Sequence, residues 1–184
     1  MMTGCFLKGR RIYLRVLTKS DITIWHSWFN DFTVTQYMNK GIFPNTQEAQ
    51  LEYLNFILKS KNDLQLGICN KNNGLLVGIA GIHKIDWIHR HGEVSILIGD
   101  KRHWKKGIAT EAVYLIVRHA FIKMNLRRLT AGMASVNEAS RKCFETNGFI
   151  QEGRLRKHLY CNGKYADVYA LGLLKEEWPE REKE

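Results

Sequence analysis

Hydrophobic and polar positions along this chain repeat with two different periods, and these periods predict its strands and helices. Alternating or short β-branched runs predict strands over residues 11–16, 64–69, 75–84, 93–98, 128–134, 149–159 and 165–173. Apolar residues with helical spacing predict helices over residues 107–121 and 140–146, and two more after the capping patterns Thr18-x-x-Asp21 and Asn45-x-x-Glu48. This order predicts an α/β fold, with one domain over residues 1–184, a mixed β-sheet and about four helices.

Composition is typical of a soluble globular protein. Of the 184 residues, 45% are hydrophobic and 25% are charged, and apolar runs of about six residues are too short to span a membrane. No charged segment followed by an apolar stretch opens the sequence, so we expect neither a secretory signal nor a membrane partner. We expect no metal site and reduced, cytoplasmic thiols, because C-x-x-C pairs and metal-ligand spacing are missing among Cys5, Cys69, Cys143 and Cys161. The charged residues 175–184 are expected to fray.

Positive charge is concentrated in one third of the chain. Residues 101–164 hold fourteen Lys or Arg and four Glu, which accounts for the whole net charge of +10. The densest point runs from Lys101 to Lys106. Such a field attracts anions, for example nucleic acid, a nucleotide cofactor or an acidic surface. A solvated face that only aids solubility is an equally good interpretation of the charge alone.

The segment from Trp104 to Ala112, WKKGIATEA, follows a predicted strand and begins a predicted helix. A helix N-terminus has unpaired N–H groups and a partial positive charge, so it can bind a phosphate. Gly107 allows a close approach of the backbone to an anion, and Ala109 keeps the first turn open. The segment therefore predicts a phosphate-binding loop, with an ordinary strand-to-helix turn as the alternative. It has neither the glycine pattern of a dinucleotide fold nor that of a P-loop.

Several segments resemble the Gcn5-related N-acetyltransferase (GNAT) superfamily, in particular its ribosomal-protein N-terminal acetyltransferases. Residues 104–112 are similar to the pyrophosphate loop of that family, although Trp104 stands where most members have Gln or Arg. Residues 137–149 are similar to its second signature, and residues 11–21 and 163–178 match the branch pattern near the two ends. The resemblance implies central strands that splay apart like a V, with acetyl-CoA as the cosubstrate in the opening.

The resemblance also implies roles for individual residues. Glu93 is similar in placement to the glutamate base of the family, and the alternative is a carboxylate paired with a basic neighbour such as Arg90. Ser140 is either the acid that protonates the thiolate or the N-cap of its helix. Cofactor contacts are implied for the amides of Leu97 or Ile98 and for Lys105, Lys106, Gly107, Ile108, Ala109, Thr110, Asn137 and Lys142. Acceptor contacts are implied for Trp28, Trp87 and Tyr160.

Other residues are weaker candidates for chemistry. Cys143 stands beside Phe144 on the apolar side of a short helix, which predicts a buried structural thiol rather than a nucleophile. His83, His89 and His91 share no ligand-like spacing and are expected in a loop.

These observations predict an acetyl-CoA-dependent N-acetyltransferase, as a monomer or a homodimer. Its acceptor is a primary amine on a protein N-terminus, an amino sugar, a polyamine or an antibiotic. The basic run Arg154-x-Arg156-Lys157 favours a phosphate-bearing acceptor or a ribosomal partner, and it also fits CoA alone. The alternative function is a non-catalytic module that senses CoA or binds RNA, although the chain has no RNP-type aromatic motif and no zinc knuckle.

Overall fold

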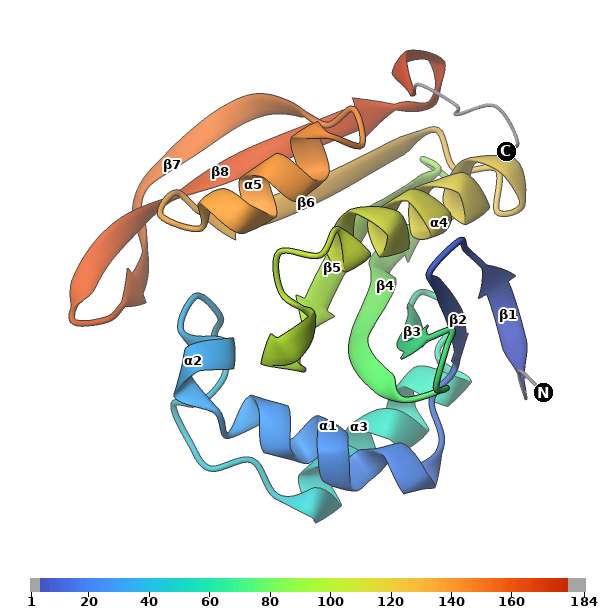
Figure 1. The fold of residues 1–184 in the computed structure, drawn as a ribbon. Coiled ribbons are helices and arrows are strands. Elements are labelled where there is room, and N and C mark those ends of the chain that lie inside the picture. Colours follow the sequence, from blue (N-terminus) through green and yellow to red (C-terminus); the bar gives the residue numbers. More distant parts are fainter. Residues whose placement is uncertain (1–3, 179–184) are drawn as a thin grey trace.

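In a computed structural model that describes residues 4–178, a mixed sheet forms the centre of the molecule (Figure 1). Its eight strands lie in the order β1-β2-β3-β4-β5-β6-β8-β7. The strands are β1 (Cys5–Lys8), β2 (Ile12–Val16), β3 (Leu64–Asn70), β4 (Leu76–Asp86), β5 (His91–Ile98), β6 (Arg128–Ala134), β7 (Ile150–Cys161) and β8 (Lys164–Leu174). The α-helices are α1 (Ile22–Phe29), α2 (Phe32–Thr35), α3 (Gln47–Lys59), α4 (Ile108–Ile122) and α5 (Glu138–Glu145). Short 3-10 turns are η1 (Lys19–Asp21), η2 (Lys101–His103) and η3 (Lys175–Glu177).

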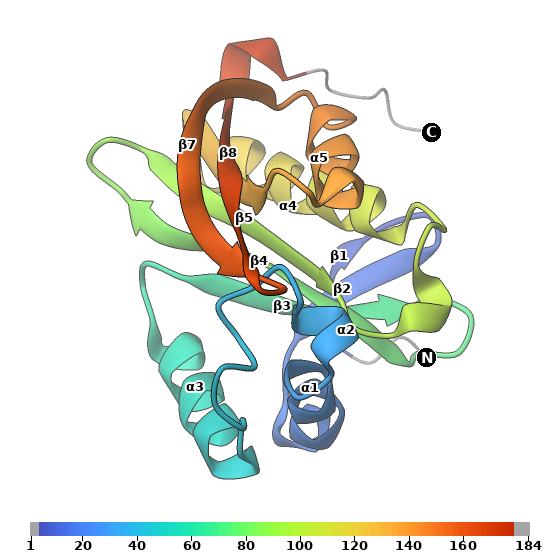
Figure 2. The same ribbon diagram turned by 90° about the vertical axis from the view of Figure 1, so that its left-hand side faces the viewer.

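Helices cover both faces of this sheet. Figure 2 shows α1 and α3 on one side and α4 and α5 on the other. α4 packs on the sheet through a core that includes Ile116 and Phe121, and α1 and α3 pack through a second core around Trp25. Side chains of β5 alternate between these cores, with Leu97 in the α1/α3 core and Ile98 in the α4 core. No helix in the described part of the chain is long and apolar enough to cross a membrane.

The sheet divides between β5 and β6, which run parallel. The two strands pair over three residues only, from His91↔Arg128 to Glu93↔Thr130. Beyond this point, among the described residues, β5 pairs with β4 alone and β6 with β8 alone. The strands therefore diverge in a V (Figure 1), which confirms the predicted splay. We call the last pair, Glu93 and Thr130, the fork.

The structure contains two elements that the sequence pattern does not predict, β1 and α2. Each is four residues long, too short for a periodic signal. The start of α3 also differs from expectation, because its N-cap is Thr46, whose hydroxyl accepts a hydrogen bond from the Ala49 amide at 3.1 Å. The predicted cap, Asn45, instead donates to the side chain of Gln50 at 3.0 Å.

The prediction that residues 175–184 fray is wrong for their first four positions. η3 continues from β8, and Trp178 is buried against the rings of Tyr114 and Phe121, at 5.7 Å from each. This aromatic contact joins the end of the described chain to α4. Residues 179–184 lie outside the described part.

Arg15 and Asp21 form a buried ion pair at the entry to α1. Arg15 donates to both carboxylate oxygens at 2.7 Å, and the Thr18 amide donates to Oδ2 at 2.7 Å, as the capping pattern predicts. Burial alone would raise the pKa of Asp21, but these donors hold it below its ordinary value. The pair therefore contributes stability that is present above a pH of about 4 and is lost as the pH falls through the lowered pKa.

We expect Asp21→Asn to lower the free energy of unfolding by about 3–5 kcal/mol at neutral pH, because the nearly buried Arg15 guanidinium loses its charged partner. Denaturant unfolding at several pH values measures this loss, which should shrink in acid. Glu176→Gln is the control, because it breaks an exposed pair with Arg127 at 3.8 Å and should cost less than about 1 kcal/mol. Equal losses in the two variants would contradict the expectation.

Candidate active site

The N-terminus of α4 lacks a side-chain cap. Gly107 is its N-cap residue, with a φ of 72°, and the Glu111 amide donates to the Gly107 carbonyl at 3.1 Å to close the first turn. The amides of Ile108, Ala109 and Thr110 precede that bond, so α4 has no i→i−4 acceptor for them. Their N–H groups and the helix dipole can bind an anion.

The residues before this helix add to the same site. Lys105 and Lys106 are exposed, and Lys105 has a φ of 58°, left-handed like Gly107 two positions later. Such an alternation directs successive amides to one side of the chain and makes an anion-binding concavity. The side chain of Ile108 is buried in the α4 core, so this residue can offer a ligand only its backbone.

Arg11 braces this loop, and no local sequence pattern reveals the contact. Its Nη1 donates to the Lys106 carbonyl at 2.6 Å, its Nη2 donates to the Gly107 carbonyl at 3.3 Å, and its Nε pairs with Glu111 at 3.0 Å. A Cβ on Gly107 would lie 2.8 Å from Arg11 Nη2. The brace therefore fixes the carbonyls of the loop, and a side chain at position 107 would displace the Arg11 guanidinium.

Glu93 lies at the fork, on the same face of β5 as Leu97, and its carboxylate is 42% exposed. Its Oε2 accepts a hydrogen bond from Lys84 Nζ at 2.8 Å. This contact raises the pKa of Lys84, which therefore stays cationic. The expected alternative partner, Arg90, instead donates to Asn125. Glu93 therefore provides a partly exposed carboxylate at the point where β5 and β6 separate.

Strand pairing decides which amide of β5 faces the diverging side. The Gly99 amide donates to the Val77 carbonyl at 3.0 Å, and antiparallel alternation then directs the Leu97 amide toward β4 and the Ile98 amide away from it. The Ile98 carbonyl, on that same side, accepts from Trp104 Nε1 at 2.7 Å. Of the two amides that the resemblance implies, Ile98 is therefore the one that can polarise a bound carbonyl group.

The start of α5 corrects one expectation. Its N-cap is Asn137, whose Oδ1 accepts a hydrogen bond from the Ser140 amide at 3.1 Å. Ser140 is the third residue of the helix, so its interpretation as the N-cap is wrong. Its half-buried hydroxyl is therefore not used for capping, and Asn137 has its Nδ2 group left for a ligand. Lys142 is exposed on the same helix.

The three aromatic residues implied as acceptor contacts lie in different places. Trp28 is 4% exposed and packs in the α1/α3 core, as its helical spacing also allowed. Trp87 lies on the turn between β4 and β5 and donates from Nε1 to the Lys61 carbonyl at 3.0 Å. Tyr160 is exposed near the tip of the β7–β8 hairpin, in edge contact with Tyr165. The fold therefore does not assemble these residues into one surface.

The hairpin borders an open cavity of about 380 Å³, which the segment after α2 and the segment after β6 also line. Its lining residues are Tyr37, Ser135, Val136, Cys161, Asn162, Lys164, Tyr165, Ala166 and Asp167. Ser135 follows directly on β6, five positions beyond the fork residue Thr130. The cavity therefore lies just beyond the end of β6.

The histidines occupy strands as well as the expected loop. His83 is on β4 and His91 begins β5, and only His89 lies in the turn between them. The ring of His83 contacts Asp63, just before β3, and Ser95 on β5, a connection that sequence spacing does not show. Within residues 4–178, no group of three or more His, Cys, Asp or Glu is placed to hold a metal.

Burial separates the cysteines into reactive and protected thiols. Burial raises the pKa of Cys143 to about 11, and it also raises the pKa of Cys69. We expect a thiol reagent at pH 8 to modify the exposed Cys5 first and to leave Cys69 and Cys143 unmodified until the protein unfolds. Mass spectrometry of the labelled protein, with and without denaturant, checks this order. Early labelling of Cys143 would contradict it.

Comparison with known proteins agrees with this geometry. A family model described as an acetyltransferase (GNAT) domain matches residues 11–150. The uncharacterized N-acetyltransferase p20 of Bacillus licheniformis is 29% identical over 174 residues, which cover 94% of this chain and 97% of that protein. The putative ribosomal N-acetyltransferase YdaF of Bacillus subtilis is 38% identical, but only over 106 residues, 58% of this chain and 57% of its own. The ribosomal branch is therefore matched over part of the chain only.

Relatives that match over almost the whole length include polyamine enzymes. The spermidine N(1)-acetyltransferase of Vibrio cholerae is 25% identical over 172 residues, which cover 93% of this chain and 97% of that protein. The crystal structure of the Vibrio cholerae spermidine N-acetyltransferase in complex with CoA and spermine matches with a TM-score of 0.83 and 23% identity, covering 91% of this chain and 97% of that one. At this identity the structural match shows a common fold.

Proposed function

We propose, because this chain belongs to the acetyltransferase (GNAT) family, that it transfers the acetyl group of acetyl-CoA to a primary amine of a small molecule. One observation gives the main support: β5 and β6 stop pairing at Glu93, so a carboxylate lies at the point where the sheet opens. The uncapped start of α4 is the matching site for the phosphates. The protein is expected to act in the cytoplasm, where Cys5, Cys69, Cys143 and Cys161 stay reduced.

The residues of the α4 loop fit the anionic part of acetyl-CoA. The amides of Ile108, Ala109 and Thr110 would hold the pyrophosphate, and the exposed Lys105 and Lys106 would neutralise its charge. Bound acetyl-CoA supplies an activated acetyl group. Farther along, the Nδ2 group of Asn137 would hydrogen-bond the pantetheine arm, and Lys142 would pair with the 3′-phosphate.

Three groups of the chain then serve the transfer. The Ile98 amide donates a hydrogen bond to the acetyl oxygen, where negative charge develops. Glu93 accepts a proton from the arriving ammonium group, directly or through water, and so frees the nitrogen lone pair. Ser140 donates a proton to the departing sulfur from the first turn of α5.

A polyamine is the acceptor that we place first. Relatives that match over more than nine tenths of the chain include a protein named spermidine N(1)-acetyltransferase, and a cavity of about 380 Å³ lies just beyond the end of β6, a volume in the range of small-ligand sites. Tyr160 stands on the hairpin that borders this cavity, so its exposed ring would cover an acceptor there. Trp28 and Trp87 are less well placed for such a role.

The test is acetylation of an amine panel with labelled acetyl-CoA. We expect turnover of spermidine and spermine, and weaker turnover of amino sugars, aminoglycosides and peptides with a free N-terminus. Transfer to the peptides alone would indicate that the acceptor is a protein N-terminus. CoA binding without transfer to any amine would favour the alternative of a non-catalytic CoA-sensing module.

One surface favours a second class of acceptor. The β7 strand exposes Arg154, Arg156 and Lys157. This basic edge could attract the phosphates of a nucleotide-linked amino sugar or of ribosomal RNA. Adding nucleotide-linked amino sugars and ribosomes to the panel compares this class with polyamines directly. If the basic edge binds the acceptor, Arg156→Glu lowers turnover of the phosphate-bearing acceptors and leaves spermidine turnover unchanged.

A further inference from the structure

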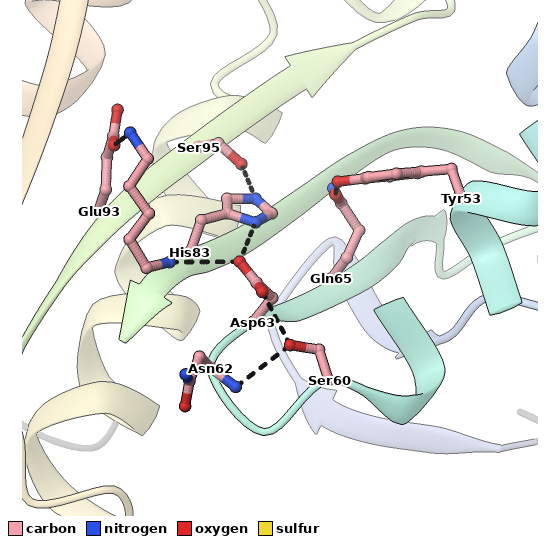
Figure 3. A network of polar contacts seen from close by, with 9 residues as sticks. Tyr53, Ser60, Asn62, Asp63, Gln65, His83, Glu93 and Ser95 are labelled. Carbon is pink, nitrogen blue, oxygen red and sulfur yellow. Dashed lines mark hydrogen bonds and ion pairs between the residues drawn. The ribbon is translucent and has the colours of Figure 1, made fainter. Parts of the chain in front are cut away.

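Asp63, His83 and Ser95 form a hydrogen-bonded chain on the α1/α3 face of the sheet (Figure 3). Nε2 of His83 lies 2.8 Å from Oγ of Ser95, and Nδ1 lies 3.3 Å from Oδ1 of Asp63. The hydroxyl and the carboxylate therefore contact opposite nitrogens of one imidazole. In this arrangement the ring can take a proton from the hydroxyl while the carboxylate fixes its tautomer.

Asp63 is held in place by donors from two sides. Ser60 Oγ donates to its Oδ2 at 2.8 Å, and the Lys84 amide donates to its Oδ1 at 3.2 Å. Burial alone would raise the pKa of Asp63, but these donors and His83 hold it below its ordinary value. Lys84 lies in a β-bulge with a φ of 51°, a strained conformation that aims its amide at this carboxylate. The bulge in β4 therefore helps to hold Asp63 beside the imidazole of His83.

Ser95 lies in the part of β5 that has left β6. It is two residues beyond Glu93 on the same face of the strand, between the fork and the Ile98 amide. Its direct partner on β4 is Gly81, where a Cβ would lie 3.1 Å from His83 Nε2. The missing side chain lets the imidazole reach across to Ser95. Along β5, Ser95 therefore lies between Glu93, the proposed proton acceptor, and Ile98, whose amide is proposed to hydrogen-bond the acetyl oxygen.

We propose that Ser95 and His83 form a proton relay that serves the acceptor nitrogen in addition to Glu93. This inference rests on the proposed function. An ammonium nitrogen loses two protons when it becomes an amide, while the C–N bond forms and the C–S bond breaks with its electron pair on sulfur. Glu93 takes the first proton. Ser95 Oγ takes the second as its own proton passes to His83 Nε2, and Asp63 stabilises the imidazolium.

The relay returns to its starting state without a further reactant. One of the two protons replaces the proton given to sulfur, and the other reaches solvent. Ser95 contacts the reacting nitrogen in this scheme, whereas His83 and Asp63 act through it. A second proton acceptor for the amine is the role that this scheme gives to the hydrogen bond between His83 on β4 and Ser95 on β5.

The charges around His83 come from several elements. Asp63 precedes β3, Glu93 is the direct partner of His83 on β5, and Lys84 is the next residue on β4. From α3, Tyr53 donates to Gln65 at 3.4 Å (Figure 3), and burial together with Asp63 raises the pKa of Tyr53. Tyr53 is therefore neutral in the working range, and Asp63 is the carboxylate in direct contact with the His83 ring.

The first test needs no turnover. Nitrogen-15 NMR at pH 7.5, with the His83 signal identified by its loss in His83→Gln, reports the tautomer of the ring. We expect a neutral imidazole protonated on Nδ1, with Nε2 accepting from Ser95. An Nε2–H tautomer, or an imidazolium at this pH, would overturn the relay even if every amine in the panel proved to be a substrate or none did.

The second test is kinetic. Ser95→Ala should lower kcat about 100-fold with the KM for acetyl-CoA unchanged, and Ser95→Thr should restore most of the rate. Asp63→Asn should lower kcat and shift the ring away from the Nδ1–H tautomer in the NMR experiment, because the imidazole loses the carboxylate that contacts Nδ1. His89→Gln, an exposed histidine on the neighbouring turn, is the control and should change neither. A Ser95→Ala enzyme within twofold of the parent would refute the relay without affecting the proposed function.

Discussion

Replacing Gly107 with Asp is expected to weaken CoA binding by about 100-fold or more, because a carboxylate at the uncapped start of α4 repels the pyrophosphate at close range. The new Cβ would also lie 2.8 Å from Arg11 Nη2, so the brace that fixes the loop has to move. Both effects act on the same amides. Isothermal titration calorimetry with CoA measures the loss.

Gly163 offers a matched control for this substitution. It has a φ of 76°, close to the 72° of Gly107, and a Cβ there meets no atom within 4 Å. Gly163→Asp therefore makes the same chemical change in the same backbone conformation, at the tip of the β7–β8 hairpin. We expect it to bind CoA like the parent. Unchanged affinity in Gly107→Asp, with the protein folded, would remove the α4 loop from the proposed site.

Replacing Glu93 with Gln is expected to lower kcat by about 100-fold or more near neutral pH, because the site loses the group that accepts the ammonium proton. The loss should shrink as the pH rises toward the pKa of the acceptor amine, since an increasing share of the amine is then already neutral. Affinity for CoA should stay unchanged, because Glu93 lies at the fork rather than in the α4 loop. Steady-state kinetics across pH measures both effects.

Glu52→Gln is the control for Glu93→Gln, since it removes an exposed carboxylate from α3 and should leave the rate unchanged. Lys84→Met tests the Glu93 carboxylate in another way, because it removes the ammonium group that donates to Oε2 at 2.8 Å. A parental rate and pH profile in Glu93→Gln would show that the proton leaves by another route. The Ser95 and His83 variants would then identify that route.

Arg11 connects two segments that are far apart in the sequence. It stands between β1 and β2, yet it holds the carbonyls of a loop about 95 residues later through bonds to Lys106 and Gly107. Because charge alone does not hold two carbonyls and a carboxylate at fixed angles, the planar guanidinium of Arg is needed there. The α4 loop is therefore held in its conformation by a residue from near the start of the sequence.

Local pattern alone determined most elements of this protein. The periodic spacing between residues 107 and 121, the Asn-Gly turn of the hairpin and the Thr18-x-x-Asp21 cap each fix a structure within a few residues, so they are visible in the chain. The structure adds a second reason for glycine at position 107, because this N-cap residue of α4 has a left-handed φ of 72°. The four-residue β1 and α2 left no such signal.

Tertiary structure alone decided which groups meet. Lys84 pairs with Glu93, Arg11 braces the α4 loop, and His83 reaches Ser95, each through strand pairing or packing that spacing along the chain does not encode. The direction of the Ile98 amide follows from the register of β5 on β4, which a shift of one residue would reverse. The type of each side chain is known from the sequence, but its neighbours are set by contacts between segments that are distant in the chain. A hydrogen bond forms only where those contacts bring the donor and the acceptor within hydrogen-bonding distance.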